Sequence, residues 1–208
     1  MKEKRKAEKV NDNALAIFIK NPILGKAKTR IAKDSSDKKA LEIYKNLLSI
    51  TRGISEQVDC KKYVFYDQFI DEGDDWSNAN FDKKLQKGND LGERMLAAFI
   101  MLENENIKKT VLIGSDCPYI SPALIQEAFD SLDKHDFVLG PTLDGGYYLI
   151  GMKKASEVVF SNIEWSQETV LENTLERILE IDCSYFLLER LNDIDHLADW
   201  HEYSSHLN

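Results

Sequence analysis

The amino-acid sequence predicts an α/β fold with a mainly parallel β-sheet and an antiparallel insertion. Short apolar runs typical of buried strands occupy residues 14–20, 63–66, 110–114, 137–140, 147–151 and 185–188. Segments with a helical spacing of apolar residues separate most of them, at 37–57, 91–103, 122–132, 167–181 and 194–201. This alternation indicates right-handed βαβ units, which build a parallel sheet. The runs at 137–140 and 147–151 follow each other too closely for this pattern, so we expect an antiparallel insertion there.

Local patterns justify the individual elements. The first run is short, continuous and apolar, as in a buried strand. The segment 37–57 repeats apolar residues every three or four positions, which is typical of an amphipathic helix. Ser121 followed by Pro122 resembles an N-cap with proline at the first helical position. The polar segment 67–90 is long for a connection, and long loops in compact domains are often functional.

Length and composition indicate one domain. The chain has 208 residues, of which 43% are hydrophobic, enough for one sizeable core. We expect residues 1–12 to be a disordered arm and residues 13–208 to be a single domain. The net charge of −9, from 27 basic and 36 acidic residues, excludes a general nucleic-acid binder, which needs a basic face. Nucleotides remain possible ligands, because a few local cations or a metal ion suffice for them.

Cysteine usage favours a cytoplasmic protein. The three cysteines are odd in number and far apart, so a disulfide framework or a zinc site is not expected. Residues 1–10 are charged throughout and lack the apolar core of a signal peptide. The first apolar run is too short to cross a bilayer, and we expect no membrane span.

A basic loop follows the first strand, from Lys20 to Arg30. Lys20, Lys28 and Arg30 can bind phosphate oxygens, and the arginine can do so in bidentate fashion. Gly25 permits close approach of the backbone to a ligand. The loop matches neither the Walker A motif nor G-x-G-x-x-G. A solvated basic turn is the alternative interpretation.

An isolated carboxylate stands at the end of the strand at 110–114. The sequence Gly-Ser-Asp-Cys-Pro places Asp116 at the carboxyl edge of the predicted sheet, where ligands of open α/β sheets bind. Mg²⁺ and Mn²⁺ are hard cations that bind through one or two carboxylates together with substrate phosphates. We therefore expect Asp116 to be a metal ligand; the alternative is that it caps the following turn.

Two later acidic segments offer further ligands. Asp144, in Asp-Gly-Gly between two apolar runs, is a second metal ligand or a base that acts on an acceptor hydroxyl; a plain hairpin turn is the alternative. Gly145 and Gly146 of the same turn are candidates for substrate binding. In Asn-Asp-Ile-Asp near the end of the chain, Asp195 is a candidate metal ligand, although Asp193 or Asp195 alternatively caps the last helix.

The remaining candidates concern the base and the sugar. Gln86, Gly88 and Arg94 belong to a polar segment suited to a nucleotide pocket, and Arg94 is alternatively a charge on a helix surface. Trp165 stacks on a sugar or base, or packs in the core.

Together, these motifs resemble a known family: the bacterial GT-A-like proteins of the nucleotide-diphospho-sugar transferase superfamily, whose substrate is unknown. The resemblance runs from about residue 14 to about residue 200. It rests on the motifs FIKNP, GKAKTR, QKG, DLGERM, IGSDCP, LGP, DGGYYLIG, EWS and DID in this order. More distantly, the chain is similar to the guanylyltransferases and cytidylyltransferases that act on molybdopterin and phospholactate, which have the same basic loop.

The resemblance implies a three-layer, Rossmann-like GT-A fold that binds a nucleotide diphosphate, with a divalent metal ion at the position of Asp116. Two departures stand out. Glycosyltransferases of this fold usually have Asp-x-Asp at the metal, whereas this chain has Ser-Asp-Cys, so Asp144 or Asp195 must contribute if a metal binds. Nucleotidyltransferases usually have several glycines in the first loop, which Pro22 and Gly25 replace.

We therefore expect a glycosyltransferase that uses a nucleotide-diphospho-sugar donor and Mg²⁺ or Mn²⁺. The first alternative is a nucleotidyltransferase that uses an NTP and releases pyrophosphate. The second is a non-catalytic nucleotide-binding protein. The residues name no base, sugar or acceptor and indicate no oligomeric state.

Overall fold

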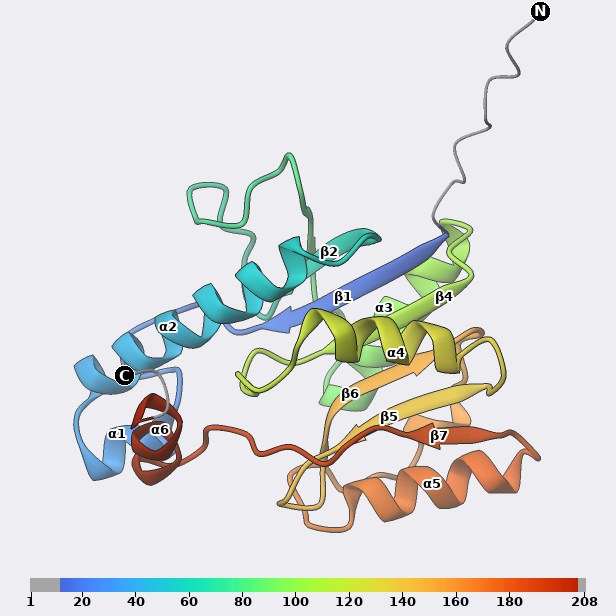
Figure 1. The fold of residues 1–208 in the computed structure, drawn as a ribbon. Helices are drawn as coiled ribbons and strands as arrows, with labels where there is room; N and C mark the ends of the chain where they lie inside the picture. The colour runs from blue at the N-terminus through green and yellow to red at the C-terminus, as the bar shows by residue number, and fades with distance from the viewer. Residues whose placement is uncertain (1–11, 206–208) are drawn as a thin grey trace, which may run out of the picture.

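The computed structural model describes residues 12–205, which form a seven-stranded sheet with helices on both faces (Figure 1). The strands are β1 (Asn13–Ile19), β2 (Lys61–Tyr66), β3 (Asp82–Leu85), β4 (Lys109–Ile113), β5 (Phe137–Pro141), β6 (Tyr147–Met152) and β7 (Tyr185–Leu187). The helices are α1 (Thr29–Asp34), α2 (Asp37–Glu56), α3 (Leu91–Asn104), α4 (Pro122–Ser131), α5 (Val170–Glu180) and α6 (Leu197–Ser205), with one 3-10 turn, η1 (Val158–Phe160). Residues 1–11 of the expected arm lie outside the described residues, and the division into an arm and one domain stays a prediction.

The sheet is mainly parallel, with the strand order β3-β2-β1-β4-β6-β5-β7. β6 runs antiparallel to both β4 and β5, and the other neighbouring pairs are parallel. The predicted α/β fold with an antiparallel insertion is therefore confirmed, and β6 is the inserted strand. Since β1, β4 and β5 point the same way, the loops that follow them meet at one edge of the sheet.

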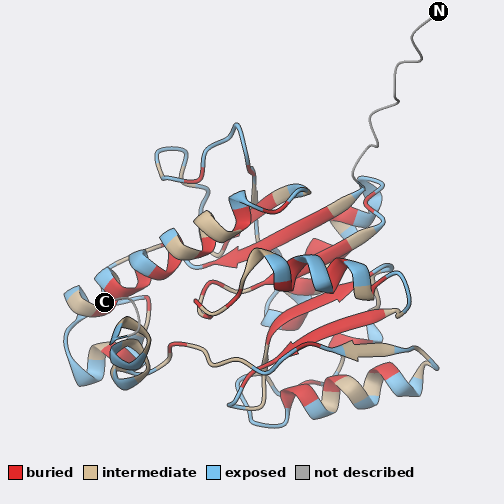
Figure 2. Ribbon diagram, in the orientation of Figure 1, coloured by how far each residue is buried: buried red, intermediate tan, exposed pale blue. Residues whose placement is uncertain are grey.

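Two hydrophobic cores cover the two faces of the sheet (Figure 2). On one face, Tyr44 of α2 and Phe129 of α4 pack against buried strand residues. On the other face, Phe99 of α3, Phe160 of η1 and Ile178 of α5 do the same. The central strands are buried on both sides, which explains why their sequences read as continuous apolar runs.

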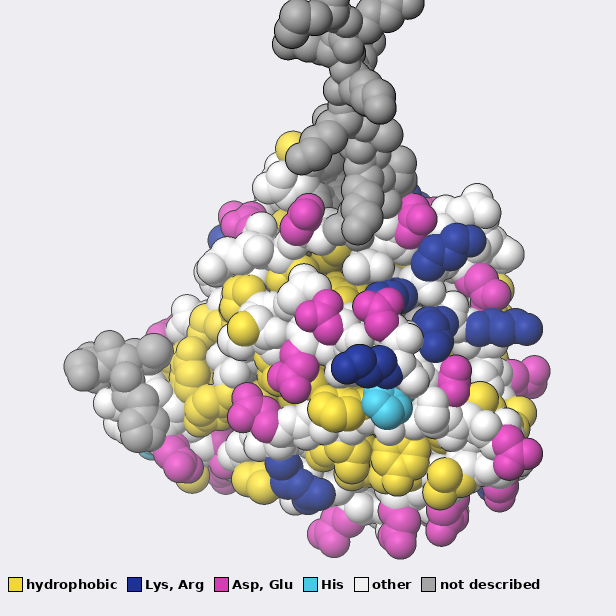
Figure 3. Space-filling model, turned by 45° about the vertical axis from the view of Figure 1, so that its right-hand side comes forward, with side chains coloured by type: hydrophobic (Ala, Val, Ile, Leu, Met, Phe, Trp, Pro, Cys, Tyr) yellow, Lys and Arg dark blue, Asp and Glu magenta, His cyan; other side chains and the backbone are white. Residues whose placement is uncertain are grey.

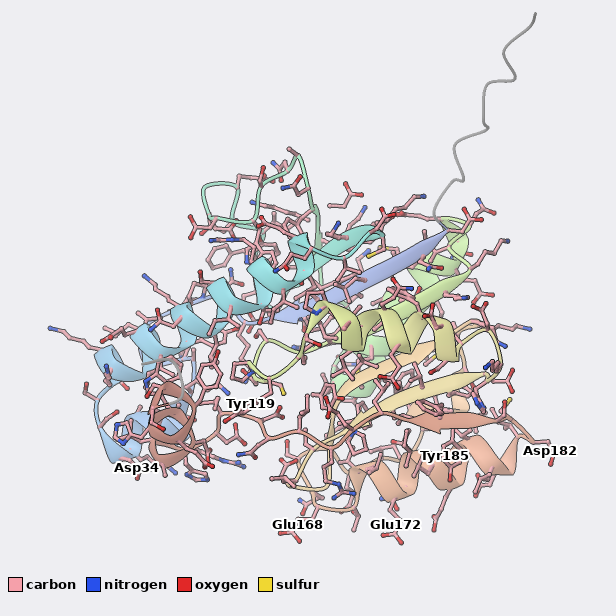
Figure 4. The ribbon with its side chains drawn as sticks, in the orientation of Figure 1. Asp34, Tyr119, Glu168, Glu172, Asp182 and Tyr185 are labelled. Atoms are coloured by element: carbon pink, nitrogen blue, oxygen red, sulfur yellow. The ribbon has the colours of Figure 1, made fainter. Side chains whose placement is uncertain are left out.

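A smaller third core lies beyond the carboxyl ends of the strands, where α1 and α6 meet at the left of Figure 1. Ile31 of α1, Ile43 of α2 and Ile194 before α6 are fully buried in it. The ring of Tyr119, from the loop after β4, packs edge-on against Tyr203 of α6, with 5.2 Å between centroids (Figure 4). This core holds the first basic loop and the carboxyl-terminal segment beside each other.

Some elements differ from the expectations. β3 and α1 were not expected, because β3 reads Asp-Lys-Lys-Leu and α1 has only six residues. Ser121 does cap α4, its side chain accepting from Leu124 N at 3.1 Å. No helix within residues 12–205 is long and apolar enough to cross a membrane. The face seen in Figure 3 intermixes basic and acidic side chains and has no continuous basic surface.

Candidate functional site

The basic loop leaves β1 and turns sharply towards α1. Gly25 has φ of +74°, in the left-handed region that favours glycine. Lys28 also has a left-handed backbone, with φ of +51°, and stands at the N-cap position of α1. This backbone conformation is uncommon for a residue with a side chain, and it directs the chain into α1. It costs conformational energy, which the contacts of the Lys28 side chain must offset.

Cationic and anionic side chains share one cavity of about 300 Å³ at the edge of the sheet. Its lining consists of Lys20, Lys26, Lys28, Thr29, Arg30, Tyr44, Asp116, Asp144, Ser166 and Asp195. Six of the residues selected from the sequence lie together here: Lys20, Lys28, Arg30, Asp116, Asp144 and Asp195. Segments that are far apart along the chain thus build one polar site from both signs of charge.

Lys28 stands at the centre of this charge arrangement. Its Nζ lies 2.9 Å from Asp116 Oδ1 and 3.5 Å from Asp195 Oδ1, and it donates to the carbonyl oxygen of Ile194 at 2.7 Å. Only 6% of its side chain is exposed. Burial lowers the pKa of Lys28, but the carboxylates of Asp116 and Asp195 outweigh it, and the pKa lies above its ordinary value. The ammonium group is therefore charged at neutral pH.

Asp195 has a second cationic partner. Arg30 Nη1 donates to Asp195 Oδ2 at 2.9 Å, so each oxygen of this carboxylate faces a different cation. Asp195 reaches the cavity because the segment before it is bonded to the sheet edge. Leu191 N donates to Pro141 O at 3.1 Å, and Ile194 N donates to Asp116 O at 2.9 Å.

Asp193 is buried beside these groups, and sequence reasoning did not select it as a site residue. At the start of α6 the recorded acceptor is Asp199 Oδ2, to which the backbone N–H groups of Asp195 and His196 donate at 3.0 and 2.6 Å; capping by Asp193 or Asp195 stays a prediction. Burial, and then the charge of Asp116, raises the pKa of Asp193 to about 7. Its Oδ1 is buried and has no hydrogen-bond partner among the described residues, an environment suited to a proton or a cation.

Asp144 is held in a tight turn with one oxygen left available. Its Oδ1 accepts from Thr142 Oγ1 and from Gly146 N, the latter at 3.2 Å. These bonds orient the carboxylate at the cavity wall. Asp144 shapes the turn between β5 and β6 through Oδ1, while Oδ2 is not engaged in these hydrogen bonds. A role in the hairpin turn is thus compatible with a functional role of the carboxylate.

Tyr44 joins the basic loop to the acidic strand end. Its buried hydroxyl accepts from Lys20 N at 2.7 Å, lies 3.0 Å from Lys20 O and lies 3.2 Å from Ser115 Oγ. Burial, followed by the nearby charge of Asp116, raises the pKa of Tyr44, which stays protonated. Nothing in the sequence separated Tyr44 from the other apolar positions of its helix.

The three candidates from the polar segment do not line this cavity. Gln86 Nε2 donates to Ile19 O at 3.0 Å and to Phe65 O at 2.9 Å, so its amide protons bridge the ends of β1 and β2. Arg94 Nε donates to Gly88 O at 3.1 Å and holds the loop before α3. These contacts give Gln86 and Arg94 structural roles. A role of Gln86, Gly88 and Arg94 in nucleotide binding stays a prediction.

The remaining substrate candidates pack tightly. A Cβ at Gly92 would lie 2.6 Å from the Trp165 ring, so this tryptophan covers the start of α3. Gly145 has φ of +88°, and a Cβ there would lie 1.9 Å from Glu168 O. Gly145 thus permits the close approach of the segment before α5, whose Leu171 N donates to Gly145 O at 2.9 Å. Gly146 donates to Asp144 as described above.

The oxygen-rich lining suits a hard divalent cation by its chemistry. Asp116, Asp144 and Asp195 present carboxylates to one cavity, and the partnerless Oδ1 of Asp193 lies close by in the same acidic cluster. Among the residues that the structure describes, no three His, Cys, Asp or Glu side chains are already gathered as a metal centre. Lys28 Nζ instead contacts Asp116 and Asp195. The donor set therefore fits Mg²⁺ or Mn²⁺ only if this ammonium moves away.

The comparisons with known proteins place the chain in a family. The model of the family described as "Uncharacterized protein conserved in bacteria (DUF2064)" matches residues 51–167, more than half of the chain. The chain belongs to this family. No curated protein matches it.

Solved structures share the fold of this chain. A protein from Desulfovibrio desulfuricans G20, described as a "putative nucleotide-diphospho-sugar transferase", is 29% identical with a TM-score of 0.82, over 89% of this chain and 83% of that one. This likeness agrees with the resemblance seen in the motifs. A 4-diphosphocytidyl-2C-methyl-D-erythritol synthase is 10% identical with a TM-score of 0.61, over 97% and 100% of the two chains. A CMP:2-keto-3-deoxy-manno-octonic acid synthetase complexed with CTP is 11% identical with a TM-score of 0.54, over 94% and 98%. At these identities the latter two share the fold alone.

Proposed function

We propose that this protein is a transferase that uses a nucleotide-diphospho-sugar donor and a divalent cation, Mg²⁺ or Mn²⁺, to glycosylate an acceptor hydroxyl. The observation that carries the proposal is the single cavity in which Lys20, Lys28 and Arg30 face Asp116 and Asp144. A diphosphate needs cations around it, and carboxylates such as those of Asp116 and Asp195 would hold a divalent cation that neutralises it. The likeness to the Desulfovibrio protein, whose description names a nucleotide-diphospho-sugar, points to the same donor class.

The charged side chains divide the work of binding the donor. Lys20 and Arg30 reach the cavity from two ends of the basic loop, and Arg30 can bind two phosphate oxygens at once. Asp116 and Asp195 would hold the metal ion, which supplies charge stabilisation to the leaving nucleotide diphosphate when bound. The same cations hold the diphosphate in place as it leaves.

Asp144 is proposed to act on the acceptor. In the transfer, an acceptor oxygen forms a bond to the anomeric carbon of the sugar, and the bond from that carbon to the diphosphate oxygen breaks. The acceptor hydroxyl proton passes to Asp144, and the nucleotide diphosphate leaves with the bonding electron pair. Thr142 Oγ1 and Gly146 N, both bonded to Asp144 Oδ1, keep the second carboxylate oxygen in a defined position for this step.

The test is a turnover assay over a panel of nucleotide-diphospho-sugars with Mn²⁺, in which released nucleotide diphosphate is measured with and without candidate acceptors. We expect release with one donor, and a loss of about 100-fold or more in Asp144→Asn. Asparagine Oδ1 can accept the same two hydrogen bonds as the aspartate, so this variant keeps the turn and should bind the donor as before. Full turnover in Asp144→Asn would remove the proposed base.

One feature favours a second candidate function, nucleotidyl transfer. Four cations, Lys20, Lys26, Lys28 and Arg30, line the cavity, and Asp116 stands without the neighbouring carboxylate of an Asp-x-Asp pair. Four cations beside a carboxylate that lacks an Asp-x-Asp partner also suit the charge of a triphosphate. Pyrophosphate released from an NTP in the same assay would support this function instead. Tight nucleotide binding with no turnover of any donor would support the third possibility, a non-catalytic nucleotide-binding protein.

A further inference from the structure

The position of Lys28 conflicts with direct binding of a metal ion. Its buried ammonium group contacts Asp116 at 2.9 Å and Asp195 at 3.5 Å, the two carboxylates proposed to hold the metal. A divalent cation held by the same oxygens would lie within a few ångströms of this ammonium, and like charges at such a distance repel strongly in a partly buried site. Lys28 and the metal ion therefore compete for one place.

The ammonium group is well held when no ligand is present. It donates to Ile194 O at 2.7 Å in addition to its two carboxylate contacts. Arg30 covers the other oxygen of Asp195. The acidic cluster is thus neutralised by cations of the chain itself, which removes much of the attraction that Asp116 and Asp195 would exert on a free metal ion.

A bound diphosphate would offer Lys28 another partner. Its side chain lines the same cavity as Lys20 and Arg30, the side chains proposed to hold phosphate oxygens. A lysine side chain is a point charge on a flexible four-carbon stem, so its ammonium can move several ångströms without a change of backbone. A move from carboxylate to phosphate preserves its charge pairing and frees Oδ1 of Asp116 and Oδ1 of Asp195, while Arg30 stays on Oδ2 of Asp195.

We propose that Lys28 is an internal counter-cation that blocks the metal site until a nucleotide diphosphate arrives. In this scheme Asp116 and Asp195 bind a divalent cation weakly in the free protein and tightly once the phosphates have taken up the Lys28 ammonium. The consequence is obligatory coupling: metal and nucleotide enter together, and the free protein does not retain metal. The blocking step concerns the protein alone, whereas its release rests on the proposed function.

The test measures Mn²⁺ binding directly, by the electron paramagnetic resonance signal of free Mn²⁺, in the absence of nucleotide. We expect Lys28→Met to bind Mn²⁺ roughly tenfold or more tightly than the unsubstituted protein, because a positive charge has left the site. Asp116→Asn added to Lys28→Met should remove the gain and so assign it to this site. The matched control is Lys26→Met. Lys26 lines the same cavity but has no recorded contact with a carboxylate, so the Mn²⁺ affinity of this variant should change less than about threefold.

Two further variants keep the test decisive. Lys28→Gln can still donate to Ile194 O without a positive charge, and replaces Lys28→Met if circular dichroism shows that the latter is not folded. Lys28→Arg keeps the charge and should bind Mn²⁺ as weakly as the unsubstituted protein. Equal Mn²⁺ affinity in Lys28→Gln and the unsubstituted protein overturns the proposal. In a second arm, each nucleoside diphosphate is added; failure of all of them to bind would count against the proposed function but leave the first arm's result on Lys28 intact.

Discussion

Removal of the Tyr44 hydroxyl tests how the basic loop is held against the acidic strand end. In Tyr44→Phe, Lys20 N loses its acceptor at 2.7 Å, and Ser115 Oγ loses a partner at 3.2 Å. The hydroxyl is buried, so water does not readily replace it. A lost hydrogen bond costs about 1 kcal/mol and a partly buried unsatisfied donor about 1–3 kcal/mol, so we expect unfolding to become easier by about 2–3 kcal/mol.

This loss is measurable by urea unfolding followed by circular dichroism. For a domain of this size, 1 kcal/mol corresponds to about 2–4 °C in Tm, so the variant should melt roughly 4–12 °C lower. The variant should also bind nucleotide diphosphates more weakly, because Lys20 is then less firmly placed at the cavity.

The matched control is Tyr147→Phe. The Tyr147 hydroxyl is buried and interacts with the Thr174 side chain, with no other partner recorded among the described residues, so its removal should cost less than about 1 kcal/mol. The reasoning is refuted if Tyr44→Phe is as stable as the unsubstituted protein, or if both variants lose the same free energy of unfolding.

Two other predictions concern the stability of the fold. Gly145→Ala should lose about 2–4 kcal/mol of stability in urea unfolding, because φ of +88° is strained for alanine and its Cβ would lie 1.9 Å from Glu168 O. Gly53→Ala, inside α2 with no atom near its Cβ, should instead gain up to about 1 kcal/mol; a loss at both positions would contradict the argument. Hydrogen bonds from the Ser184 backbone N–H and hydroxyl lower the pKa of Asp136, so the carboxylate stabilises the fold above its ordinary pKa of about 4 and less as the pH falls below it. Asp136→Asn should therefore be destabilising at pH 7 and approach the unsubstituted protein in stability towards pH 3. A difference in stability that does not change with pH would show that these hydrogen bonds to the carboxylate are not its cause.

The fold could largely be predicted because its signals are local. Continuous apolar runs mark strands buried on both faces, and Ser121 with Pro122 marks the start of α4. β3 gave no such signal, because it pairs at the sheet edge through its backbone and its sequence is charged; the buried side chain of Lys83 is paired with Asp74. The parallel pairing of β3 with β2 depends on contacts between residues distant in sequence, which the composition of β3 alone does not predict.

The site could be predicted only in part. The selection of Asp116 and the basic loop depended on position after a strand, and strands of a parallel sheet bring such loops together. The contacts of Lys28 could not be foreseen, since Asp116 and Asp195 lie 88 and 167 residues further along the chain. The same holds for Gln86, whose amide bridges two strand ends 67 and 21 residues away.

The central claim is that the basic loop and the acidic strand end together bind a nucleotide diphosphate with a divalent cation. The most direct measurement is calorimetric titration of the five common nucleoside diphosphates into the protein, with and without Mn²⁺, and into Asp116→Asn. We expect at least one nucleotide to bind roughly tenfold or more tightly with Mn²⁺, and this gain to vanish in Asp116→Asn without a change in Tm beyond a few degrees. Binding that ignores Mn²⁺, or a gain that survives in Asp116→Asn, would contradict it.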